Sequence, residues 1–300
     1  MQFDRISFLK QLKARKERIE QHLLGCLPVD AYPPVIHQAM HYAVSNGGKR
    51  LRPIMTAEGA VLAGMPDQLV MTTACAIEMI HCYSLVHDDL PAMDDDDLRR
   101  GKPTCHIVFG EANAILTGDA LLTRAFELMA ANAAEPGIDP GNAVRAIREV
   151  AAAIGSSGMI GGQVLDLQWV GQQIELKDLQ CLHLLKTGAL FQAALRAGAI
   201  LAGMDEERLK ALDDYARHFG LAFQITDDIL DVNGNEELIG KPVGSDQKNQ
   251  KTTYVSLFGL EAAHDLARQS AEQCLQALAG FGREADFLRN LVCFILQRDN

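Results

Sequence analysis

The pattern of apolar and polar residues along this chain is typical of one helix after another. Alternating runs of Val, Ile and Thr bounded by turn dipeptides, which would indicate strands, are absent. Ala and Leu are abundant, and both lose little conformational entropy in a helix. We therefore predict helices over the following ranges, with ends good to a few residues: 3–26, 33–46, 52–64, 67–92, 111–133, 141–157, 160–170, 175–203, 205–233, 252–280 and 283–297.

One of these helices is apolar on every side. The segment from Thr72 to Leu90 (TTACAIEMIHCYSLVHDDL) has no polar stripe, which predicts a central helix surrounded by others. It ends in acidic residues, so that end should face a cavity or water. Turn signals fall at 47–48, 135–141 and 233–250, but none resembles a flexible linker between domains. The sequence predicts an all-α, single-domain helical bundle over 1–300.

Composition excludes several classes of protein. The net charge of −11 argues against a nucleic-acid partner, because such binding depends on Lys and Arg at phosphates. Seven scattered cysteines with no C-x-x-C suit a reducing compartment. The best apolar stretch, Gly188 to Met204, is interrupted by Gln192 and Arg196, so we expect no membrane insertion. The N-terminus has no pattern of a secretory signal, which favours a cytoplasmic protein.

Two clusters of aspartates close apolar helices. The first runs from Asp88 to Asp97 (DDLPAMDDDD) and the second is DDILD, from Asp227 to Asp231. In the second cluster Asp227, Asp231 and Gln224 share one helix face. Carboxylates about 4 Å apart repel by roughly 4 kcal/mol at an effective dielectric near 20. Magnesium would reverse the sign, since it binds one or two carboxylates together with substrate phosphates.

The geometry of the first cluster leaves two candidates open. Asp94 lies six residues after Asp88 and would point about 120° away from it on an unbroken helix. Pro91 cannot continue the hydrogen-bond ladder, so a distortion there could redirect Asp94. Asp95, seven residues along, would follow Asp88 on an ideal helix.

Three groups of basic residues accompany the acidic ones. Each group alone would be interpreted as a solvated surface. Beside two acidic clusters they favour a diphosphate site, because Arg binds such groups bidentately, Lys acts as a point charge, and Gly lets the backbone approach. The groups are Lys49, Arg50 and Arg52; Arg99, Arg100 and Lys102; and Lys241, Lys248 and Lys251.

The ordered motifs GGKRLRP, DDLPAMDDDDLRRGKPTCH, GGQVLDL, KTGALF, FQITDDILD and GKPVGSDQKNQKTTY extend from residue 47 to 254. In this order and spacing they resemble the trans-prenyl diphosphate synthases, most closely the bacterial farnesyl diphosphate synthases. The resemblance implies an all-α fold with helices around a deep central cavity and a homodimer. It also implies magnesium as cofactor, about three ions per active site.

The resemblance also implies roles for individual residues. Asp88 and Asp94 would hold magnesium from one wall, supported by Asp89. Asp227 would do so from the other wall, with Asp228 and Asp231 near it. Thr187 and Gln224 would present oxygens near a developing carbocation. The diphosphate of isopentenyl diphosphate would be bound by Lys49, Arg52, His81 and Arg100, and that of the allylic substrate by Arg99, Lys186, Lys241 and Lys251.

The implied reaction is a head-to-tail condensation of isopentenyl diphosphate with dimethylallyl or geranyl diphosphate. The allylic carbon–oxygen bond ionises, the double bond attacks the cation, and a proton leaves to the released diphosphate. The glycine-rich segment 233–250 is the candidate for a closing loop. Product length would be set along 72–90. A helical wheel places Ser84 nearer the Asp88 face, whereas the family pattern makes Tyr83 the floor, which suits farnesyl diphosphate.

Alternative functions differ in what the sequence should contain. A geranyl or geranylgeranyl diphosphate synthase would share every motif and differ in product. A terpene cyclase would lack GGKRLRP and carry an Asn/Ser/Glu metal motif in place of the second aspartate cluster. A non-catalytic regulatory subunit would typically have lost one cluster. The presence of both clusters and of GGKRLRP favours a chain-elongating prenyltransferase.

Overall fold

The computed structural model describes residues 3–233 and 251–297, and it is almost entirely helical, as predicted. The first helices lead to the acidic cluster at Asp88. They are α1 (Arg5–Gly25), α2 (Pro34–Val44), α3 (Leu51–Leu62), the 3-10 turn η1 (Asp67–Val70) and α4 (Met71–Asp88). A short hairpin follows, in which β1 (Leu98–Arg99) pairs antiparallel with β2 (Lys102–Pro103).

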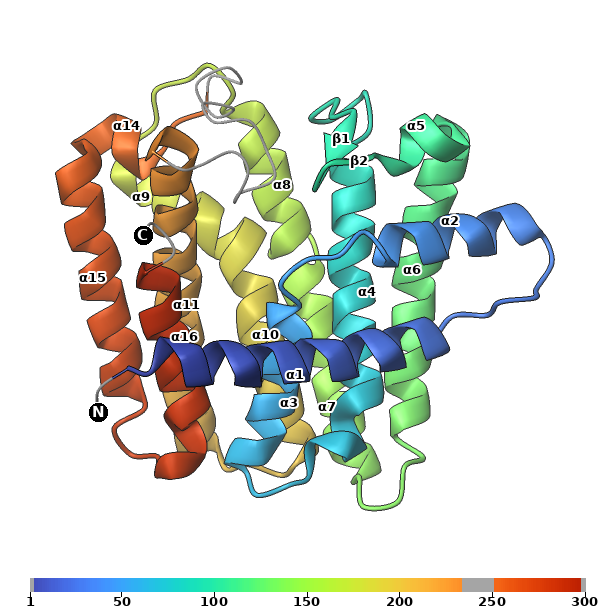
Figure 1. The fold of residues 1–300 in the computed structure, drawn as a ribbon, viewed down its shortest axis with the longest axis horizontal. Helices are drawn as coiled ribbons and strands as arrows, with labels where there is room; N and C mark the ends of the chain where they lie inside the picture. Colours follow the sequence, from blue (N-terminus) through green and yellow to red (C-terminus); the bar gives the residue numbers. More distant parts are fainter. Residues whose placement is uncertain (1–2, 234–250, 298–300) are drawn as a thin grey trace.

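The remaining elements build the rest of the bundle (Figure 1). They are α5 (Cys105–Phe109), α6 (Glu111–Asn132), α7 (Pro140–Ile154), α8 (Met159–Gln168), α9 (Leu176–His183), the π-helical turn η2 (Leu184–Gly188), α10 (Ala189–Leu201), α11 (Glu206–Asn233), α14 (Tyr254–Phe258), α15 (Leu260–Ala277), the 3-10 turn η3 (Arg283–Ala285) and α16 (Asp286–Leu296).

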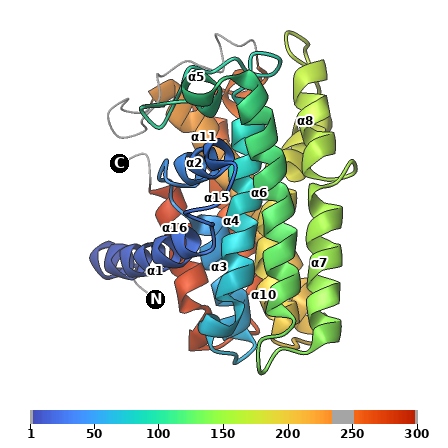
Figure 2. The ribbon, with the colours of Figure 1, turned by 90° about the vertical axis from the view of Figure 1, so that its right-hand side faces the viewer.

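The long helices run roughly parallel or antiparallel to one another, while α1 lies across them (Figure 1). The main packing pairs are α4 with α6, α3 with α10, and α11 with α15. Most of α4 is buried, including Glu78 among its apolar residues, so the prediction of a central helix is confirmed. Both helices that end in aspartate clusters, α4 and α11, reach the same end of the bundle (Figures 1 and 2).

Three predicted helices differ from the structure by more than a small shift of their ends. The range 67–92 is wrong at its end, since α4 stops at Asp88 before Pro91, which has no N–H to continue the ladder. The range 175–203 is interrupted by η2. The range 252–280 breaks at Gly259, whose φ of 81° lies outside the helical region and separates α14 from α15.

The expectation that no segment is long and apolar enough to cross a bilayer is wrong. By length and composition, three helical segments qualify: Asp67–Asp88, Pro140–Gln168 and Leu176–Leu201. In the fold, 72% of the apolar window of the first and 61% of that of the third are buried inside the protein, against 28% for the second. The apolar side chains of the first and third segments therefore belong largely to the protein core.

Helices α3 and α10 cross at backbone contact. A Cβ added to Gly198 on α10 would overlap the carbonyl oxygen of Thr56 on α3. A Cβ on Gly59 would overlap the carbonyl oxygen of Leu195 in the same way. Glycine at these two positions therefore sets the distance between α3, which carries Arg52, and α10, which follows the turn that contains Lys186.

Gly198→Ala is expected to lower the free energy of unfolding by about 3 kcal/mol, because the new methyl group must push two packed helices apart. Denaturant unfolding followed by circular dichroism measures this. Gly280→Ala is the matched control, since a Cβ there meets nothing within 4 Å. Equal stability of the two variants would contradict the close crossing.

Candidate active site

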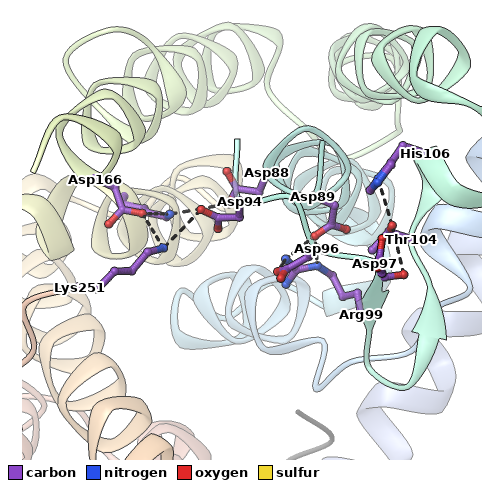
Figure 3. Close-up of polar contacts among 11 residues, drawn as sticks. Asp88, Asp89, Asp94, Asp96, Asp97, Arg99, Thr104, His106, Asp166 and Lys251 are labelled. Carbon is purple, nitrogen blue, oxygen red and sulfur yellow. Dashed lines mark hydrogen bonds and ion pairs between the residues drawn. The ribbon is translucent and has the colours of Figure 1, made fainter. Parts of the chain in front are cut away.

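Asp88 and Asp94 lie together although six residues separate them (Figure 3). The chain turns sharply after α4, and the backbone N–H of Asp94 donates to the carbonyl of Asp88 at 2.9 Å. Asp95 is exposed and has a left-handed φ of 53°. The turn therefore brings Asp94, not Asp95, next to Asp88. Burial, against the opposing effect of Lys186 and with a smaller contribution from the negative charge of Asp94, raises the pKa of Asp88 to about 6.

Asp166 on α8 joins two lysines beside this carboxylate pair (Figure 3). Its Oδ2 accepts from Lys186 Nζ at 2.6 Å and from Lys251 Nζ at 3.2 Å. Lys186 Nζ also lies 3.8 Å from Asp88 Oδ2, and Lys251 Nζ lies 3.4 Å from Asp94 Oδ1. Burial opposes ionisation of Asp166, but Lys186 and Lys251 hold its pKa below the ordinary value. The sequence motif GGQVLDL contains this residue, yet no role was predicted for it.

The second aspartate cluster lies on α11. Asp228 is buried and points toward α14: Oδ1 accepts from Gln224 Nε2 at 3.0 Å and Oδ2 from the backbone N–H of Tyr254 at 2.9 Å. Asp231 is also buried, whereas Asp227 is half-buried. Thr187 Oγ1 donates to Gln224 Oε1 at 3.3 Å, which links η2 to α11.

The π-helical turn η2 holds Lys186 and Thr187 between two close contacts. A Cβ on Gly162 of α8 would overlap the backbone of Lys186, and a Cβ on Gly220 of α11 would lie 3.0 Å from the Cα of Gly188. Glycine at both positions lets α8 and α11 approach this turn.

Three adjoining cavities connect the acidic and basic residues. The largest, about 560 Å³, is mostly apolar and reaches from Arg52, His81 and Asp88 down to Tyr83 and Ser84. A second, about 280 Å³, is lined by the GGKRLRP segment and shares Arg52 and His81 with the first. A third, about 120 Å³, shares Lys186 and Thr187 with the first and contains Asp166, Gln224, Asp228 and Lys251.

The basic cavity combines cations with aromatic walls. Arg52 lies 4.2 Å from the centroid of the Phe191 ring, and Lys49 lies 5.7 Å from that of Phe223. Arg100 donates to the carbonyl oxygen of Gly47, and a Cβ on Gly48 would overlap its guanidinium. Burial lowers the pKa of Arg52 to about 10, so this group stays charged at neutral pH.

His81 lines both the basic cavity and the apolar one. Burial lowers its pKa well below the ordinary value, and Arg52, Arg100 and other nearby guanidinium groups lower it further. The imidazole is therefore neutral at physiological pH. It can donate one hydrogen bond to an anion, but it does not act as a cation.

The predicted residues Asp89 and Arg99 pair with each other. Arg99 Nε donates to Asp89 Oδ1 at 2.6 Å and its Nη2 lies 3.5 Å from Asp96 (Figure 3). Neither residue belongs to the linings of the three cavities. Lys241 and most of the predicted closing loop 233–250 lie outside the described residues.

A second ion pair missed by sequence reasoning supports the basic cavity. Arg50 is buried at the start of α3 with a left-handed φ of 54°. Its Nη1 donates to Glu78 Oε1 at 2.7 Å and its Nη2 to the carbonyl of Val44 at 2.5 Å. One feature of the sequence could have predicted this contact: Glu78 is an isolated acidic residue inside a long apolar helix, and a buried carboxylate requires a partner.

The donor set suits magnesium bound together with a substrate. Among the described residues, no group of three or more His, Cys, Asp or Glu side chains is arranged to hold a metal. Magnesium does not require such a cage, because it keeps several waters and binds through one or two carboxylates plus phosphate oxygens. The pair Asp88 and Asp94 offers two carboxylates, with Lys186 3.8 Å from Asp88 and Lys251 3.4 Å from Asp94, and Asp88 lines the largest cavity.

Comparisons with known proteins agree with this geometry. Residues 33–287 match the family model described as polyprenyl synthetase. The chain is 45% identical to farnesyl diphosphate synthase of Escherichia coli over 98% of its length and 100% of that protein. It is 46% identical to that of Geobacillus stearothermophilus over 85% of each chain. It is 43% identical to geranylgeranyl diphosphate synthase of Cyanophora paradoxa, over 98% and 97% of the two chains.

A solved structure has the same fold. The structure described as an FPP/GFPP synthase from Zymomonas mobilis superimposes with a TM-score of 0.86 at 38% identity, covering 97% of this chain and 99% of that one. Sequence, fold and site thus lead to one conclusion: this chain belongs to the polyprenyl synthetase family.

Proposed function

We propose that this protein is a prenyltransferase that condenses isopentenyl diphosphate with dimethylallyl and geranyl diphosphate to give farnesyl diphosphate. The observation that supports it most is the connection of three environments: a cationic cavity, a pair of acidic residues with lysines, and an apolar cavity of about 560 Å³. The farnesyl diphosphate synthases among the relatives favour that product over the geranylgeranyl one.

Asp88 and Asp94 would hold magnesium from one wall and Asp227 from the other, with about three ions per active site. When bound, magnesium neutralises the charge that develops on a departing diphosphate. Lys186 and Lys251 add positive charge at the same place, where Asp166 keeps both ammonium groups near Asp88 and Asp94.

The remaining residues bind and orient. Lys49, Arg52, Arg100 and neutral His81 would receive the diphosphate of isopentenyl diphosphate in the cationic cavity. Thr187 and Gln224 would place oxygens near the allylic cation, held in position by their mutual hydrogen bond. The apolar walls keep water from the cation. The proton lost in the last step passes to the released diphosphate.

We also propose a homodimer, a single catalytic domain over 1–300 and a cytoplasmic location. Leu116 on α6 and Val144 on α7 are more than half exposed, and Ile160 on α8 is exposed as well. Helix α7 contacts both α6 and α8, so the three helices form one face of the bundle (Figure 2). A second copy of the chain would cover this face.

The function is tested by incubating the protein with Mg²⁺, isopentenyl diphosphate and allylic diphosphates of graded length, followed by chromatography of the products. Farnesyl diphosphate as the main product supports the proposal. Cyclised hydrocarbons from an allylic diphosphate alone would indicate a terpene cyclase, and no consumption of substrate would indicate a regulatory subunit.

Tyr83→Ala is expected to shift the main product to twenty carbons or more. The ring is buried in the wall of the apolar cavity, and its removal leaves space for a longer chain. Ser84→Ala, which removes only an oxygen at the adjacent position, is the control. A product distribution equal in both variants would reject Tyr83 as the floor.

His81→Gln is expected to keep the KM for isopentenyl diphosphate within a few fold, whereas His81→Ala should raise it about tenfold, the cost of one hydrogen bond to a charged group. The neutral imidazole can be replaced by an amide donor but not by a methyl group. Steady-state kinetics at saturating geranyl diphosphate provides the measurement. An equal rise in both variants would show that the histidine acts as a cation.

A further inference from the structure

His87 is a wall residue of the apolar cavity that the proposed mechanism does not use. It follows Tyr83 by one turn of α4, so both rings lie on one face of that helix. The two rings meet edge to face, with centroids 5.8 Å apart and planes at 81°. This is a favourable arrangement for aromatic rings, in which each limits the movement of the other.

The His87 ring packs against α6 and is held there by a hydrogen bond. Its Nε2 lies 3.0 Å from the carbonyl oxygen of Ile115, and because a carbonyl only accepts, Nε2 carries the proton. Gly118 supplies the space for the ring, since a Cβ there would overlap the imidazole. Leu122, one turn further along α6, lines the same cavity.

Tyr83 and His87 on α4 therefore face Gly118 and Leu122 on α6. The contact between α4 and α6 at these residues is therefore the boundary of the cavity on this side. His87 lies one turn nearer to Asp88 than Tyr83 does, so a prenyl chain that runs from Asp88 toward Tyr83 would pass along the imidazole on the α6 side.

We propose that His87, seated over Gly118, is a second residue that limits product length, by closing the cavity between α4 and α6 and by holding the Tyr83 ring in place. This inference rests on the proposed prenyltransferase function. It assigns His87 a steric role toward an isoprenoid chain, and it gives Gly118 a positioning role through the imidazole.

The two residues should shift product length in opposite directions. His87→Ala removes the ring and opens the boundary, so the share of products of twenty carbons or more should rise about tenfold. Gly118→Ala pushes the ring away from α6 toward the cavity, so the share of geranyl diphosphate should rise at the expense of the farnesyl product. His22→Ala, on the exposed face of α1, is the control.

The experiment uses the full-length enzyme with Mg²⁺, isopentenyl diphosphate and geranyl or dimethylallyl diphosphate, with chromatography of the dephosphorylated products and a thermal melt of each variant. Opposite shifts in the two variants support the proposal. A distribution identical to the parent in either folded variant overturns it. If the parent protein consumes no isopentenyl diphosphate, the proposed function is wrong and the inference on His87 falls with it. The reaction of the parent protein therefore distinguishes this outcome from a failure of the His87 inference alone.

Discussion

Replacing Asp88 or Asp227 with Ala is expected to lower kcat by about a hundredfold to a thousandfold, the usual effect of removing one group that stabilises transition-state charge. Each aspartate supplies one of the two walls between which the diphosphate would be held. The far-UV circular dichroism spectrum should not change, because neither residue belongs to the hydrophobic core. Single-turnover measurement of product formation at saturating Mg²⁺ gives the rate of the chemical step.

The control for this experiment is Asp97→Ala. Asp97 is in the same acidic run as Asp88 but is exposed, and within residues 3–233 and 251–297 its backbone oxygen accepts hydrogen bonds from Thr104 while its carboxylate forms no hydrogen bond or ion pair. This variant should retain near-parental activity. A similar loss in Asp97→Ala would mean that net negative charge matters and not the position of the carboxylates. Near-normal activity of Asp88→Ala would remove the metal role.

Asp166→Asn is expected to lower kcat by about tenfold to a hundredfold, comparable to the loss of other groups that orient a catalytic residue. In the parent protein the Asp166 carboxylate lies 2.6 Å from Lys186 Nζ and 3.2 Å from Lys251 Nζ. The amide of Asn keeps the size of the side chain but has no negative charge to neutralise these two ammonium groups. The two ammonium groups then repel each other and lose their fixed position beside Asp88 and Asp94.

Asp30→Asn is the matched control, since Asp30 is exposed in the loop between α1 and α2. The KM for geranyl diphosphate should rise in Asp166→Asn, while the KM for isopentenyl diphosphate stays nearly the same. That difference separates a role at the lysine pair from a general loss of structure. An equal rise of both values would contradict the role proposed for Asp166.

Local sequence features were sufficient to predict the all-α fold and the central helix. Helix periodicity and composition act over a few residues, so most helical segments could be recognised from the chain alone. The bounds failed where one residue has a long-range or steric effect, as at Pro91 and Gly259. The apolar helices that are long enough to span a bilayer are not evident as uninterrupted apolar runs, because each contains a few polar or charged residues.

The site was less predictable because its geometry depends on distant contacts. A helical wheel could not choose between Asp94 and Asp95, since the chain is no longer helical after Asp88. Asp166 acquires its meaning from lysines 20 and 85 residues away, which no local pattern reveals. The pairing of Asp89 with Arg99 likewise depends on the hairpin that folds back beside α4.

The widened turn at Leu184–Gly188 has a consequence for how this fold tolerates change. A π-helical turn accommodates one more residue than an α-helical turn, so it offsets the phase of α10 from that of α9. The orientation of the α10 face that crosses α3 is therefore independent of the orientation of Lys186 and Thr187, the two side chains of the turn that line the cavities. Deleting a single residue there would leave a regular α-helical turn, so the face of α10 that crosses α3 would be kept while the positions of Lys186 and Thr187 would change.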